Sequence, residues 1–180
     1  MAVATSDYLK PISFLIVDDR AYMRRVIKGI LETLGCKHID EAHNDSEALL
    51  PKMGGMELLK AVRADKGPLK FTPLIMITSE TRRERVIMAR NAGVTEYVAK
   101  PFNAKSLILR IREVVERPRP FVDGGIYFGP DRRRRSEVMS EGEDKRGQGS
   151  PGPTAKEDPR EGLTQDQIDK LVAGDSIRDH

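Results

Sequence analysis

The sequence predicts an α/β fold, a doubly wound parallel sheet, followed by a polar tail. Up to about residue 117, short apolar runs alternate with segments of helical periodicity, which is the pattern of strands joined by helical crossovers. Two of these runs, residues 12–17 (ISFLIV) and 73–78 (PLIMIT), are almost wholly apolar, as is typical of strands that are buried on both faces. Beyond Pro118 the chain becomes rich in glycine, proline and charged residues.

The expected elements begin with a strand at 12–17. Residues 20–34 carry apolar side chains at helical spacing, and Gly35 follows them as the C-cap. Because strands and helices alternate, we expect right-handed crossovers and a parallel sheet. The remaining expected elements are strands at 37–42, 73–78 and 94–99, helices at 55–64, 80–92 and 103–117, and the start of a helix at 46–50.

The composition argues against several classes of protein. The chain has 38% hydrophobic and 33% charged residues, and no apolar run approaches the ~20 residues of a membrane span. The N-terminus lacks the features of a secretory signal, so we expect a cytoplasmic protein. The single cysteine, Cys36, excludes an internal disulfide and is expected to be a small buried side chain. The net charge of +3 does not by itself indicate nucleic-acid binding.

Three of the predicted strands are followed by polar side chains, at the edge where ligands bind in parallel α/β sheets. Asp18 and Asp19 follow the first strand and are oxygen ligands suited to Mg²⁺. Thr78 and Ser79 offer hydroxyls to an anion, and Lys100 offers an ammonium group suited to phosphate. An acidic pair after a strand is more often a helix N-cap, but the order of the three signals predicts a single site.

These motifs together resemble a known family. FLIVDD (14–19), LIMITSE (74–80) and AGVTEYVAKPF (92–102) are similar to the receiver domains of two-component response regulators of the CheY type, which have a flavodoxin-like fold. The resemblance covers residues 10–117 and implies that Lys100–Pro101 is a cis peptide. It also implies the following roles: Mg²⁺ ligands for Asp18 and Asp19, a switch hydroxyl for Thr78, a switch aromatic for Tyr97 and a phosphoryl contact for Lys100.

The resemblance implies a signalling protein of a two-component phosphorelay, with chemotaxis as one setting. Such domains receive a phosphoryl group from a histidine kinase on an aspartate, while Mg²⁺ and the lysine neutralise the developing charge. We expect action through protein–protein contacts, without enzymatic activity and without a DNA-binding output domain. The runner-up is an ordinary phosphorylatable regulator of the CheY type.

One part of the family pattern does not fit the chain. The acceptor aspartate normally ends the third strand, shortly before a loop that Pro51–Gly55 (PKMGG) matches. Only residues 43–53 lie between the second strand and the helix near Gly54, whereas a crossover alone needs about 10–12 residues. Roughly sixteen residues of the pattern are absent, among them the acceptor, and the junction lies between Leu50 and Pro51. The sequence therefore predicts a sheet that lacks one strand and one helix, and a weak or vestigial Mg²⁺ site.

Three explanations for the gap remain open. The chain has a natural or engineered internal deletion, or residues of a normal parent were lost in obtaining the sequence. Alternatively, another carboxylate, Asp40, Asp45 or Glu47, has been recruited to the site. Loss of a central strand exposes the edges of its neighbours, so we expect low stability or association through strands.

The tail contains two features of interest. Residues 118–162 are expected to be a disordered linker, because they have too few apolar side chains to offset the entropy of ordering. Within it lies an arginine run, which is either a solvated charge run or an anion-binding arm for a cyclic dinucleotide, RNA or an acidic protein face. Some CheY-like proteins carry arginine-rich tails that sense cyclic di-GMP. Tyr127 and Phe128 nearby could stack on bases. The run consists of Arg132, Arg133, Arg134 and Arg135.

Residues 163–174 predict a short amphipathic helix. Thr164 and Gln167 form a capping box, and Leu163 with Ile168 forms a hydrophobic staple. A helix of this length is marginal alone, so it should form on a partner surface. The segment also resembles the LSQxEIDALL segment of the flagellar switch protein FliM, which docks on CheY. Its docking place is either the face of this chain that contains Tyr97 or another CheY-like protein. The apolar side chains of the helix are Leu163, Ile168, Leu171 and Val172.

Overall fold

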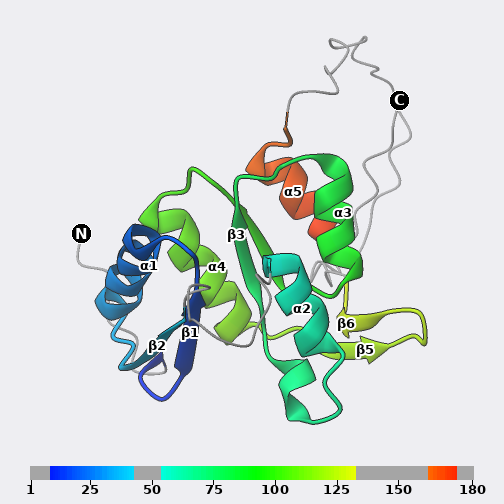
Figure 1. The fold of residues 1–180 in the computed structure, drawn as a ribbon, viewed down its shortest axis with the longest axis horizontal. Helices are drawn as coiled ribbons and strands as arrows, with labels where there is room; N and C mark the ends of the chain where they lie inside the picture. Colours follow the sequence, from blue (N-terminus) through cyan, green and yellow to red (C-terminus); the bar gives the residue numbers. More distant parts are fainter. Residues whose placement is uncertain (1–8, 43–53, 133–161, 174–180) are drawn as a thin grey trace, which may run out of the picture.

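The structure is a computed structural model that describes residues 9–42, 54–132 and 162–173. Strands and helices alternate through most of the chain (Figure 1), which confirms the predicted α/β fold. The expected helix start at 46–50 lies outside the described residues. The strands are β1 (Ser13–Val17), β2 (His38–Ala42), β3 (Ile75–Thr78), β4 (Glu96–Ala99), β5 (Phe121–Asp123) and β6 (Phe128–Pro130). The helices are α1 (Ala21–Thr33), α2 (Gly55–Arg63), the 3₁₀ turn η2 (Pro68–Phe71), α3 (Arg83–Asn91), α4 (Ala104–Glu116) and α5 (Gln165–Val172).

Local sequence signals fix the ends of the helices. Gly35 has a φ of 85°, a left-handed conformation that favours glycine, and it ends α1 as predicted. Asn103 caps α4 by accepting a hydrogen bond from the backbone N–H of Ser106 at 2.8 Å. The capping box of Thr164 and Gln167 is present at the start of α5. The Gly35 C-cap and the capping box of α5, both predicted from the sequence, are therefore confirmed.

The parallel strands form two separate pairs. β1 pairs with β2, with Ser13 opposite His38, and β3 pairs with β4, with Ile75 opposite Glu96. Both pairs are parallel, as the alternation of strands and helices predicts. Among residues 9–42, 54–132 and 162–173, no strand joins β1 to β3. The described sheet is therefore divided at the position where the sequence predicts a missing strand.

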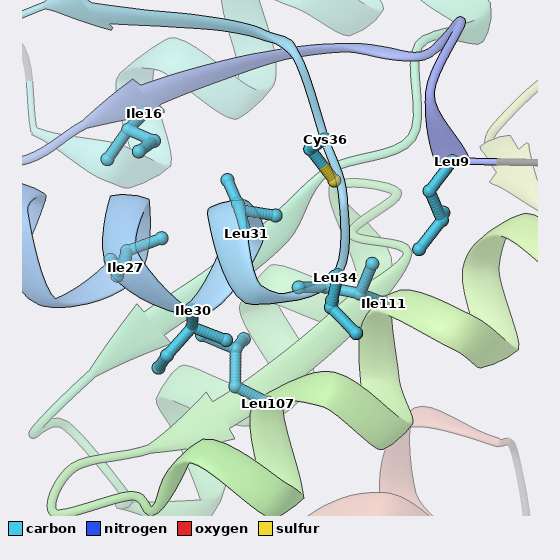
Figure 2. Packing of buried hydrophobic residues seen from close by; sticks show 9 residues of the cluster. All are labelled: Leu9, Ile16, Ile27, Ile30, Leu31, Leu34, Cys36, Leu107 and Ile111. Carbon is cyan, nitrogen blue, oxygen red and sulfur yellow. The ribbon is translucent and has the colours of Figure 1, made fainter. Parts of the chain in front are cut away.

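Two hydrophobic clusters cover the strands. The first lies between α1, α4 and one face of the strands, and Figure 2 shows its nine buried members. The second joins α2, α3, β4 and α5 on the opposite face. β3 contributes to both, because Ile75 and Ile77 pack on the first cluster while Met76, with Leu74 just before the strand, packs on the second. Cys36 belongs to the first cluster and is 6% exposed, which confirms it as a small buried side chain.

β1 differs from the prediction. Ile16 is buried, but Leu15 and Val17 are 65% and 48% exposed, so the strand is covered on one face only. The reason is that α1 and α4 cover one face, whereas no described helix packs over Leu15 on the other. Between β1, α2 and β3 lies an apolar cavity of about 140 Å³, lined by Val17, Leu59 and Ile77 among others.

Residues 118–132 correct the prediction of a disordered linker that begins at residue 118. β5 and β6 form an antiparallel hairpin with Phe121 opposite Pro130. The rings of Phe121 and Phe128 lie 5.6 and 5.5 Å from that of Phe71, which follows α2. A few aromatic side chains thus order a segment whose overall composition is polar. Residues 133–161 of the expected linker lie outside the described part of the chain.

The C-terminal helix forms as expected and lies on the body of the chain. α5 packs beside α3 and against β4 (Figure 1). Its apolar side chains join the second cluster, where Ile168 and Leu171 are 0% and 3% exposed. Of the two docking places that the sequence leaves open, the structure has α5 on the face that contains Tyr97. No helix in the described ranges has the length and apolar character needed to cross a membrane.

Candidate functional site

The polar residues at the carboxyl ends of three strands meet at one edge of the divided sheet. Asp18 follows β1, Thr78 ends β3 and Lys100 follows β4. Lys100 Nζ lies 3.1 Å from Asp18 Oδ2 and donates a hydrogen bond to it. The backbone N–H of Lys100 also donates to the carbonyl oxygen of Thr78 at 2.8 Å. Lys100 therefore joins both halves of the sheet, and the Lys100–Pro101 peptide is cis as the resemblance implies.

Asp18 is held in its ionised form. Burial raises its pKa, but the backbone N–H of Arg20 and the ammonium group of Lys100 outweigh that effect, so the pKa lies below its ordinary value. The Arg20 N–H donates to Asp18 Oδ1 at 2.9 Å. Arg24 Nη1 donates to the Asp18 carbonyl oxygen at 2.8 Å. The Asp18 carboxylate thus accepts hydrogen bonds from one ammonium group and one backbone N–H, while Asp19 is exposed beside it.

Thr78 and Tyr97 are linked through one short segment. Thr78 Oγ1 accepts a hydrogen bond from the backbone N–H of Glu80 at 3.1 Å. The Tyr97 hydroxyl donates to the backbone carbonyl oxygen of Glu80. Tyr97 is 2% exposed, and burial together with the charge of Glu80 raises its pKa to about 12. The residues matched to the switch pair therefore contact the same residue, with the tyrosine ring buried.

The donor set of the site is compatible with a weak Mg²⁺ site. Mg²⁺ in proteins usually takes one or two carboxylates and keeps several waters, and Asp18 and Asp19 could supply those carboxylates. Both oxygens of Asp18 already accept hydrogen bonds, so a cation would have to compete with Lys100. The described residues contain no cluster of three or more metal-ligating side chains.

The other candidate acceptor carboxylates are not brought to this edge in the described residues. Asp40 is exposed and lies in β2 opposite Leu15, in the middle of a strand and not at its carboxyl end. Glu41 next to it pairs with Lys28 at 3.0 Å. Asp45 and Glu47 lie outside the described residues.

Several polar residues near α5 were not predicted from the sequence. Glu96 is 3% exposed and lies between Arg110 and Arg119. Arg110 also pairs with Asp169 of α5. Gln165 bonds the backbone of β4. The signal that could have identified Arg110 is its place beside the apolar stripe of α4, where a charged side chain needs a partner.

The arginine run is described only at its first residue. The guanidinium carbon of Arg132 lies 3.7 Å from the centre of the Tyr127 ring. The Phe128 ring packs 5.7 Å from that of Phe121, so the two aromatic side chains that could have stacked on bases already have contacts within the chain. Arg133, Arg134 and Arg135 lie outside the described residues.

Comparisons with known proteins point to one family. The response regulator receiver domain family matches residues 48–112. The chain is 41% identical over 119 residues to the chemotaxis protein CheY of Pseudomonas aeruginosa, a match that covers 57% of this chain and 95% of that protein. It is 39% identical over 124 residues to CheY-3 of Vibrio cholerae, covering 60% of this chain and 95% of that protein.

A solved structure shares the fold. The response regulator DrrB of Thermotoga maritima, an OmpR/PhoB homologue, matches with a TM-score of 0.50 and 25% identity, over 63% of this chain and 57% of that one. The parallel strands, the order of the motifs and the relatives point to the same flavodoxin-like fold. The chain belongs to the family of CheY-like receiver domains of two-component response regulators.

Proposed function

We propose that this protein is a receiver-type signalling protein that acts through protein–protein contacts and does not depend on phosphorylation. The observation that carries the proposal is the division of the sheet. Asp18, Thr78 and Lys100 come together at one edge, but no described strand lies between β1 and β3. The acceptor aspartate of a receiver would be expected at the end of that strand.

The alignments support an internal deletion. The 119 aligned positions of the Pseudomonas protein correspond to 57% of this 180-residue chain, about 103 residues, so about 16 positions have no counterpart here. The family match begins at residue 48, although the FLIVDD motif lies upstream at 14–19. Both observations favour a gap near Leu50–Pro51. The exposure of Leu15 also favours it, because the helix that precedes the missing strand would be the one to cover that face.

The remaining site residues keep part of the receiver's chemistry. Lys100 would hold an anionic oxygen, and the Thr78 hydroxyl would donate to it. A bound Mg²⁺, held by Asp18 and Asp19, would neutralise negative charge there. Without an acceptor carboxylate these groups bind or position an anion but cannot store a phosphoryl group covalently. The expected partners are other signalling proteins, such as a histidine kinase or a flagellar or CheY-like protein.

Binding of a cyclic dinucleotide or RNA by the arginine run is the weaker alternative, because Tyr127 and Phe128 already make contacts inside the chain. Titration with cyclic di-GMP and with RNA at several salt concentrations tests it, since phosphate contacts weaken as salt rises.

The proposal is tested by incubating the full chain with Mg²⁺ and acetyl phosphate and measuring its intact mass. An ordinary CheY receiver serves as the positive control and should gain one phosphoryl group. This chain should gain none. A phosphorylated product would instead make it an ordinary phosphorylatable regulator, and Asp40→Asn, Asp45→Asn and Glu47→Gln would then show which carboxylate had been recruited.

A further inference from the structure

The face formed by α3, β4 and α4 is occupied by the chain's own C-terminal helix. α5 lies beside α3 (Figure 1) and contacts β4. Its side chains Ile168, Leu171 and Val172 are buried in the second cluster together with Val86 and Tyr97. An isolated helix of eight residues is unstable in water, so α5 depends on this face for its own structure.

One side chain of α5 bonds the free edge of β4. Gln165 Oε1 accepts a hydrogen bond from the backbone N–H of Ala99, and Gln165 Nε2 donates to the carbonyl oxygen of Tyr97, both at 2.8 Å. The side-chain amide therefore meets the same two groups that a neighbouring strand would use. This contact fixes the register of α5 along β4.

A charged contact fixes the other turn of the helix. Asp169 pairs with Arg110 of α4, and it also accepts a hydrogen bond from Gln165 Nε2 at 2.8 Å. The side chains of Arg110 and Asp169 are 19% and 17% exposed, so water screens the pair only in part. Asp166, one turn earlier on the same helix, is exposed, which makes it a matched control.

The segment that leads into α5 contacts the loop between β3 and α3. The backbone N–H of Leu163 donates to the carbonyl oxygen of Thr81 at 2.9 Å. A Cβ at position 162 would overlap the Thr81 hydroxyl, so this close approach requires Gly162. In the same loop, the backbone carbonyl oxygen of Glu80 accepts a hydrogen bond from the Tyr97 hydroxyl. Docking of α5 thus holds both the loop and the buried tyrosine.

We propose that α5 is a tethered, displaceable ligand of the α3–β4–α4 face, and that it closes this face to external helices of the same chemistry. Such a partner would be a short capped helix with an amide in its first turn, an acid four residues later and apolar side chains on the same side. Because α5 belongs to the same chain as the face it covers, its docking is intramolecular, which corresponds to an effective concentration of roughly millimolar. A free helix must exceed that concentration or bind more tightly to displace α5.

The test uses the full chain and a fluorescein-labelled peptide of residues 162–173 as the external helix. The wild-type chain should bind the peptide weakly because its own α5 competes. Asp169→Asn weakens the internal helix but not the peptide, so this variant should bind the peptide about tenfold more tightly. Asp166→Asn removes the same charge from the same helix and should bind like the wild type.

A second pair of variants tests the close approach. Gly162→Ala should also increase peptide binding, and adding Thr81→Ala should reverse part of that increase by removing the overlapping hydroxyl. Hydrogen exchange measured on residues 78–82 and 96–99 should be faster in Asp169→Asn and Gly162→Ala than in Asp166→Asn. Equal peptide binding by all chains, or no binding by any of them up to millimolar peptide, would overturn the proposal.

The inference rests on the proposed function only in assuming that this face serves contacts with proteins. No step of the competition experiment involves phosphoryl transfer. A chain that accepts a phosphoryl group could therefore still show the competition, and a chain that does not could fail to show it.

Discussion

Replacing Lys100 by methionine tests the geometry of the site. Lys100 Nζ is the cation that faces Asp18, and their side chains are 18% and 12% exposed. Methionine keeps most of the apolar stem of lysine but removes the charge. Asp18 would then keep a negative charge at neutral pH without its cationic partner, while the Arg20 N–H would still donate to Oδ1.

The size of the effect follows from that burial. Removing one partner of a fully buried ion pair costs about 3–5 kcal/mol, whereas an exposed pair contributes less than about 1 kcal/mol. Because the site opens to solvent beside Asp19, we expect Lys100→Met to lower the free energy of unfolding by about 1–2 kcal/mol at neutral pH.

The effect should depend on pH in a defined direction. The pKa of Asp18 is lowered from its ordinary value of 3.8, so the pair stabilises the fold above that pH and its contribution is lost as the pH falls through the lowered pKa. The difference between wild type and variant should therefore shrink in acid.

Urea unfolding at pH 7 and in acid, followed by circular dichroism, measures both effects. Lys28→Met is the matched control, because Lys28 pairs with Glu41 at the surface with 39% of its side chain exposed, and it should change the stability little. If Lys100→Met and Lys28→Met were equally stable at pH 7, the ion pair between the two halves of the sheet would have to be rejected.

Two further predictions concern Tyr97 and β1. Burial raises the pKa of Tyr97 to about 12, so the stability that the neutral hydroxyl contributes below pH 10 should be lost as the pH rises through about 12. Tyr97→Phe should remove this alkaline loss of stability in unfolding curves. If the variant lost stability in alkali just as the wild type does, the buried hydroxyl would not be its cause. Leu15 is 65% exposed on the uncovered face of β1, so the wild type should self-associate as its concentration rises. Leu15→Lys should reduce this self-association, measured by sedimentation velocity. A wild type that stays monomeric at all concentrations would contradict the prediction.

The meeting of the three strand-end residues was predictable because its signals are local. An apolar run followed by a polar residue identifies a strand end, and the carboxyl ends of parallel strands lie at the same edge of a sheet. Asp18, Thr78 and Lys100 could therefore be placed together from the sequence. Gly35 and the capping box of α5 were predictable for the same reason, since a helix end depends on a few neighbouring residues.

The features that the sequence did not reveal depend on long-range contacts. The apolar run at 12–17 predicts burial on both faces, but Leu15 is exposed because burial depends on which helices pack over the strand. The hairpin of β5 and β6 depends on contacts of Phe121 and Phe128 with Phe71, about 50 residues earlier in the chain. The partners of Gln165 and Asp169 in β4 and α4 depend on where α5 docks, which its amphipathic pattern alone does not specify.

The central claim is that this receiver keeps the edge of its site but lacks the strand that carries the acceptor. It is tested most directly by inserting the missing segment, about sixteen residues with the third strand and acceptor aspartate of a related receiver, between Leu50 and Pro51. Intact mass is then measured after incubation with Mg²⁺ and acetyl phosphate. We expect one phosphoryl group on the chain with the insertion and none on the parent chain. Phosphorylation of the parent, or a folded chain with the insertion that accepts no phosphoryl group, would contradict the account.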